Sequence, residues 1–100
     1  MLHTVNKSPF QTRNLESCLR HALPGSAVLL IEDGVYAALQ DTPFADMVRK
    51  AMEQVRFYVL GPDLEARGME PSKVIDGIEV VDYGGFVDLT VEYGTVQSWL

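Results

Sequence analysis

Cys18 is the only cysteine of this 100-residue chain and the strongest candidate for covalent chemistry. As a thiolate it could accept sulfur and carry it as a persulfide, which requires access to a partner molecule. Arg20 and His21 are close in sequence, and His21 at position i+3 could approach the sulfur. Cys18 also lies within an apolar helical stripe, where a cysteine commonly serves as a small buried hydrophobic residue. The residues alone leave both interpretations open.

Other familiar kinds of site are missing from the sequence. No GxGxxG motif and no P-loop provides a backbone cradle for nucleotide phosphates. His3 and His21 with one cysteine fall short of a zinc-binding set, and we interpret both histidines as structural. Glu32 and Asp33 are adjacent, which suits the opening of a helix better than acid/base catalysis. We therefore expect neither a cofactor nor a metal.

Short β-type segments alternate with helical stripes along the chain. The clearest strand is the continuous apolar segment 26–31, which is typical of a strand covered on both faces of a parallel sheet. The first helix is predicted to begin with Thr12 or Asn14 as its N-cap and to end before Pro24-Gly25. Its buried stripe comprises Leu15, Cys18, Leu19, Ala22 and Leu23. The other strands are predicted over residues 2–6, 57–60 and 78–82, with 95–100 as a small edge strand.

Further helices are predicted between these strands. The clearest one has the stripe Phe44, Met47, Val48, Ala51 and Met52, with Pro43 in its first turn. Shorter helices are expected after Glu32, over residues 63–67 and around 86–93. The four phenylalanines, Phe10, Phe44, Phe57 and Phe86, are expected to fill the core.

This alternation predicts an α/β fold, a three-layer α/β/α sandwich with a mainly parallel sheet of four or five strands. The chain length allows a single domain over residues 1–100. Ligands of such sheets favour the crevice beyond the carboxyl ends of the strands. Polar and Gly/Pro residues gather there, although turn formation alone explains most of them. These segments are residues 6–8, 32–34, 61–63 and 83–85.

The charge distribution narrows the possible partners. Eight basic and fourteen acidic residues give a formal net charge of -6, all of it in residues 51–100. Such a surface repels phosphate backbones, so direct binding to nucleic acid or to an anionic membrane is not expected. A single cysteine and the lack of a signal-like or membrane-spanning segment predict a soluble cytoplasmic protein.

Five segments in order along the chain resemble the DsrH/TusB family. They are residues 3–10 (HTVNKSPF), 30–38 (LIEDGVYAA), 58–68 (YVLGPDLEARG), 81–90 (VDYGGFVDLT) and 96–100 (VQSWL). The resemblance covers essentially the whole chain. Cys18 matches a position where DsrH-type sequences carry a cysteine and TusB-type relatives can lack one, which favours the DsrH branch.

The resemblance implies a DsrE/F-like fold and a place in a sulfurtransferase heterohexamer. Its partners would be DsrE/TusD-type and DsrF/TusC-type subunits, with two copies of each chain. The complex relays persulfide sulfur to a DsrC/TusE-type acceptor, in sulfur oxidation, which we favour, or in 2-thiolation of the tRNA wobble uridine. The principal sulfur-carrying cysteine would belong to the DsrE/TusD-type subunit.

Cys18 is thus a candidate auxiliary persulfide carrier. The alternative is a purely structural subunit with an inert Cys18 that completes the complex and supports the active site of its partner. A third possibility, a free-standing flavodoxin-like binding module, is disfavoured because the phosphate loop is missing.

Overall fold

A five-stranded sheet, parallel throughout, forms the centre of the computed structural model, which describes residues 1–100. The strand order is β4-β3-β2-β1-β5, so the two strands nearest the C-terminus form the two edges. The predicted α/β class and parallel sheet are confirmed, and the small C-terminal edge strand is present. The strands are β1 (Leu2–Val5), β2 (Ala27–Leu30), β3 (Arg56–Leu60), β4 (Glu79–Val81) and β5 (Val96–Trp99).

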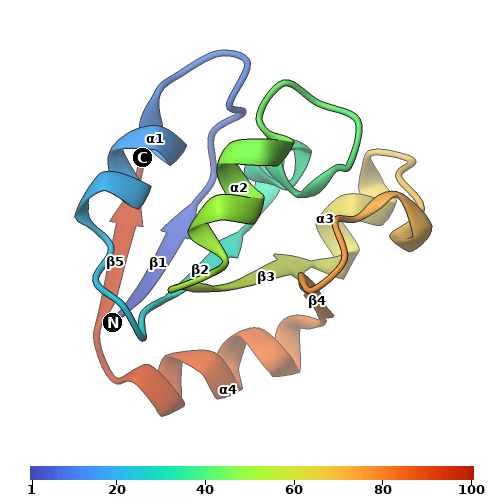
Figure 1. Ribbon diagram of the computed structural model, residues 1–100. Helices are drawn as coiled ribbons and strands as arrows, with labels where there is room; N and C mark the ends of the chain where they lie inside the picture. The colour runs from blue at the N-terminus through green and yellow to red at the C-terminus, as the bar shows by residue number, and fades with distance from the viewer.

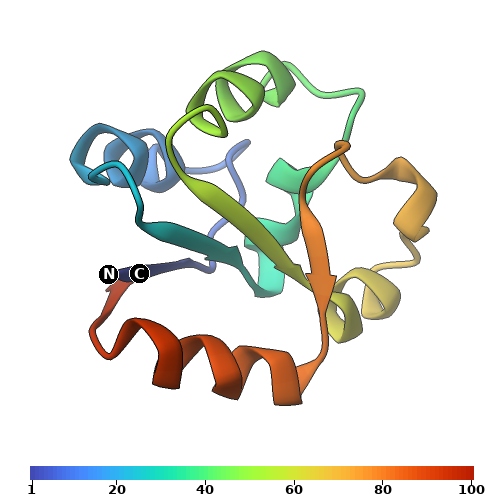
Figure 2. The same cartoon turned by 60° about the horizontal axis from the view of Figure 1, so that its bottom comes forward.

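Helices cover both faces of the sheet, but unequally. Helices α1 and α2 lie on one face, and α4 crosses the other face alone from the β4 edge to the β5 edge (Figures 1 and 2). Short helices follow β2 and β3 at the carboxyl ends of those strands. The helices are α1 (Asn14–His21), η1 (Glu32–Ala38), α2 (Ala45–Ala51), α3 (Gly61–Ala66), η2 (Pro71–Lys73) and α4 (Tyr83–Tyr93), the two η elements being 3-10 helices.

The sheet separates two hydrophobic clusters of different size. The larger has 17 buried residues and fills the space between the sheet and the α1/α2 layer. The smaller has five, Leu2, Ala27, Leu29, Tyr58 and Leu89, and lies under α4. All four residues of β2 are fully buried, as the continuous apolar segment predicts for a central strand.

Gly34 allows the chain after β2 to fold back against β1. A Cβ at this position would lie 2.1 Å from the carbonyl oxygen of Val5, so only glycine fits. Glu32, two residues earlier, has a positive φ of 50°. This close approach holds η1 against the carboxyl end of β1.

Several local expectations from the sequence are wrong. Leu23 is 73% exposed, because α1 ends at His21 and the stripe stops with it. Phe10 is 58% exposed and stacks edge-to-face on half-buried Phe44 rather than entering the core. Arg13 is the N-cap of α1, and the Thr12 hydroxyl instead accepts the backbone N–H of Asn14 at 3.3 Å.

Pro43 and Phe86 also differ from expectation. Pro43 precedes the N-cap Phe44 of α2, so it lies outside the first turn in which the sequence places it. Phe86 is only partly buried, against the smaller cluster under α4. No helix of the structure is long and apolar enough to cross a membrane.

Candidate functional site

Cys18 is fully buried on the inner face of α1. Its side chain has no exposed surface and belongs to the larger hydrophobic cluster, together with Leu15 one turn earlier on the same helix. Burial raises the pKa of the Cys18 thiol to about 12. The thiol is therefore protonated at neutral pH, and a protonated thiol is neither a nucleophile nor a sulfur acceptor.

The charged neighbours of Cys18 in sequence do not activate it. Burial is the one cause of its raised pKa, with no opposing contribution from a cation. Arg20 points outward to Glu16 at 3.5 Å, and the His21 ring bonds through Nδ1 to the carbonyl of Ser17 at 2.8 Å. The role of Cys18 as an auxiliary persulfide carrier stays a prediction, and in this conformation it would require α1 to move away from the sheet.

At the carboxyl ends of the strands the structure joins two of the segments that the sequence places there. The carboxylate of Asp63, in the first turn of α3, accepts the backbone N–H of Glu32 at 2.6 Å. Asp33 forms an ion pair with Arg67, its Oδ1 lying 2.9 Å from Nη2 and 3.0 Å from Nε. Arg67 also donates to the carbonyl of Asp63 at 3.1 Å.

These contacts fasten η1 to α3 at the carboxyl ends of the strands, an edge of the sheet that we call the rim. Asp63 holds the turn at Glu32, and Arg67, which is three-quarters buried, holds Asp33. The Ser8 hydroxyl, after β1, accepts the backbone N–H of Phe10 at 3.1 Å and so also serves a turn. Asn6, after β1, carries a buried side-chain oxygen without a hydrogen-bond partner. No group of three His, Cys, Asp or Glu side chains is placed to hold a metal ion.

The fourth segment of the predicted rim, residues 83–85, begins α4. Asp82 is the N-cap of this helix, and its carboxylate accepts the backbone N–H of Gly85 at 2.8 Å. A Cβ on Gly85 would lie 2.9 Å from the Cβ of Val81, so the glycine permits close packing of helix on strand. The helix therefore begins three residues earlier than the expected 86–93, and this segment forms its first turn.

His3, on β1, bonds to the neighbouring C-terminal edge strand β5. The indole N–H of Trp99 donates to Nδ1 of His3 at 3.1 Å, and the rings of Trp99 and His21 lie 5.7 Å apart. Burial, with smaller effects from the N-terminus and His21, lowers the pKa of His3. The sequence interpretation of both histidines as structural agrees with these contacts. Trp99 is 96 positions from His3 in the sequence. Local sequence patterns therefore could not predict that the histidines pair with it.

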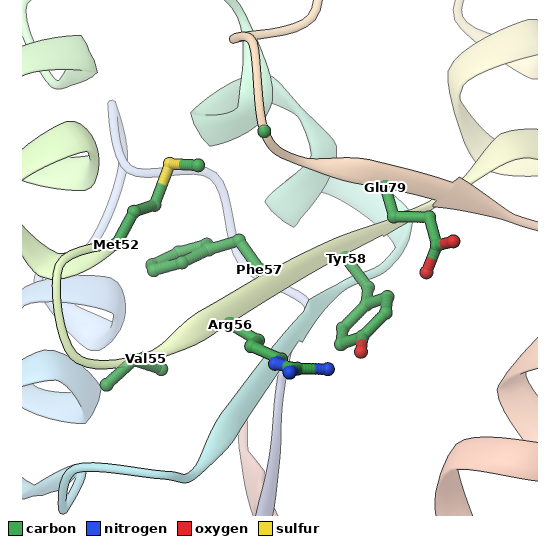
Figure 3. A pocket seen from close by; sticks show the side chains of 7 residues that line it. Met52, Val55, Arg56, Phe57, Tyr58 and Glu79 are labelled. Atoms are coloured by element: carbon green, nitrogen blue, oxygen red, sulfur yellow. The ribbon is translucent and has the colours of Figure 1, made fainter.

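A hollow of about 330 Å³ opens beside the amino end of β3, away from the rim. Figure 3 shows Arg56 and Tyr58 on one side of β3 and Phe57 on the other, toward Met52. Glu79 of β4 also lines the hollow, which therefore holds one cation and one anion. The hollow lies at the amino ends of the strands, whereas ligands of parallel sheets bind at the carboxyl ends, so it is a weaker ligand site than the rim.

The outer face of α4 is the feature that the sequence analysis missed. Tyr83, Val87 and Val91 follow one another at intervals of four and are 61%, 60% and 77% exposed. The signal was present, because the helix has a second apolar stripe besides the one that packs on the sheet. An exposed apolar row of this kind is typical of an interaction surface.

Comparison with known proteins finds a family that the chain matches. A family model described as "DsrH like protein" matches residues 7–96. Protein TusB of Pectobacterium parmentieri is 39% identical over 100 residues, covering 99% of this chain and 100% of that protein. Protein TusB of Shigella flexneri is 35% identical over 99 residues, with the same coverage. The matches do not decide between the DsrH and TusB branches.

Two solved structures share the fold. The ychN protein from E. coli superposes with a TM-score of 0.75 at 16% identity, over 97% of each chain. MTH1491 from Methanobacterium thermoautotrophicum superposes with a TM-score of 0.72 at 21% identity, over 97% of this chain and 95% of that one. At such low identity the likeness concerns the fold alone.

Proposed function

Because the chain belongs to the DsrH/TusB family of sulfur-relay subunits, we propose that it completes such a complex without carrying the sulfur itself. The observation that supports this proposal most is the state of Cys18, fully buried with a pKa of about 12. A carrier thiol must ionise and meet a donor and an acceptor. A thiol packed between α1 and the sheet does neither.

The chemistry of the relay then lies on the partner chains. By the family resemblance, the DsrE/TusD-type subunit bears the cysteine that holds the persulfide, and a DsrC/TusE-type protein accepts the outer sulfur. This chain would assemble with DsrE/TusD-type and DsrF/TusC-type subunits, two copies of each. Its own contribution is to support the active site of a partner through the contacts that it makes.

Sulfur transfer by the assembled complex tests this proposal. The Cys18→Ala complex is expected to pass sulfur to the DsrC/TusE-type acceptor at the wild-type rate. Replacement of the persulfide cysteine on the DsrE/TusD-type chain serves as the matched loss-of-function control. A severe transfer defect in a fully assembled Cys18→Ala complex would contradict the proposal and support Cys18 as an auxiliary carrier.

We infer sulfur oxidation as the pathway because Cys18 occupies a position where DsrH-type sequences carry a cysteine. The names of the curated relatives favour the alternative, since they are called TusB. Deletion of the gene distinguishes the two. Loss of growth on reduced sulfur with unchanged tRNA thiolation supports our inference, and loss of wobble-uridine 2-thiolation contradicts it.

A further inference from the structure

Helix α4 has two apolar faces, and only one of them is covered within this chain. Its inner face packs Phe86, Leu89 and Tyr93 against the smaller cluster. Its outer face exposes the stripe Tyr83, Val87 and Val91, which we call the α4 stripe. Three large apolar side chains in one row, each more than half exposed, are an unusual feature of a monomer surface.

The charges beside the α4 stripe all have one sign. Asp88 and Glu92 are exposed and form a second row at an interval of four, next to Val87 and Val91. Like charges at this spacing weaken a helix by a few tenths of a kcal/mol. The last 27 residues of the chain contain no Lys, Arg or His. Their five acidic residues are Asp76, Glu79, Asp82, Asp88 and Glu92.

Within this chain little offsets these acidic groups. Arg56, on β3, interacts electrostatically with Glu92, and it lies beside Tyr58 and Tyr93. Asp88 forms no ion pair. The acidic row therefore lowers the stability of the helix, and no ion pair within the chain compensates for it.

We propose, on the basis of the function proposed above, that the α4 stripe docks an apolar surface of a different chain whose rim carries Lys or Arg. Apolar contact with the stripe removes three large side chains from water, while basic groups at the rim meet Asp88 and Glu92. A second copy of this chain fits poorly, because two α4 faces would oppose acid to acid. Charge thus selects a different partner over self-association.

Binding to the DsrE/TusD-type and DsrF/TusC-type chains of the same organism tests this surface. Val87→Glu is expected to weaken binding by about tenfold or more, as loss of a central apolar contact does. The double variant Asp88→Lys/Glu92→Lys is expected to bind more weakly as well, and added salt to weaken the wild-type complex.

Matched controls make the same kinds of substitution at exposed positions outside α4. Leu23→Glu alters an apolar residue that is 73% exposed in the loop after α1, and Glu53→Lys reverses an exposed charge after α2. Both are expected to bind like wild type. Thermal unfolding of each isolated variant verifies that the chain still folds. We expect folding to be retained because the substituted positions are exposed.

The outcomes separate this inference from the proposed function. If the wild-type chain binds neither partner, the proposed function is overturned together with the inference. If the wild type and Val87→Glu bind equally well, the α4 stripe is not the docking surface and the proposed function stands. If the isolated chain forms a dimer that Val87→Glu disrupts, the stripe pairs with itself and the assignment to a different chain is wrong.

Discussion

Alkylation of Cys18 should be far slower in the folded chain than in the unfolded one. An ordinary cysteine with a pKa near 8.5 is about one quarter thiolate at pH 8. With a pKa of about 12, the Cys18 thiolate fraction is roughly 10⁻⁴ at that pH. The structure therefore predicts a reaction with iodoacetamide that is about a thousandfold slower, before the lack of solvent access slows it further.

The assay compares three samples at one pH by mass spectrometry. The wild type is measured folded and in guanidinium, and the double variant Cys18→Ala/Glu16→Cys supplies a thiol on the outer face of the same helix. The outer thiol is expected to react at the rate of the unfolded chain. If folded wild type reacts within tenfold of either reference, Cys18 is accessible and the reasoning from burial fails.

Further predictions concern stability. Cys18→Ser should lower the free energy of unfolding by about 1–3 kcal/mol in urea titrations, because its hydroxyl would be buried without an assured partner. Gly34→Ala should lower Tm by more than about 10 °C, since its Cβ would meet the Val5 carbonyl; an unchanged Tm would refute the close approach. The lowered pKa of His3 means that the unfolded chain binds this proton more tightly, so stability is complete above about pH 6.5 and falls below it. Urea midpoints followed by Trp99 fluorescence should show this loss, and His3→Asn should reduce it.

The sequence predicts those parts of the fold that depend on local hydrophobic patterns. The continuous apolar segment around β2 identifies the central strand, and the stripe of α1 places Cys18 toward the core. Both features follow from periodicity within a few residues. They do not depend on knowing what lies across the sheet.

Features set by distant contacts are not predictable in this way. Phe10 is apolar, but it stacks on Phe44 at the surface because its loop passes outside the core. The link from His3 to Trp99 forms only when β5 joins the edge of the sheet beside β1. The strand-end segments at Asp33 and Arg67 are recognisable as turns, whereas their ion pair is a product of the fold.

The most direct test of a structural, non-carrier role for this subunit is native mass spectrometry of the chain purified gently from its own cells, followed by denaturing analysis of each subunit. We expect two copies of this chain with two related partner chains, and an extra sulfur atom on a partner cysteine but none on Cys18. An extra sulfur atom on Cys18 would contradict it, as would a lone monomer that binds no related chain.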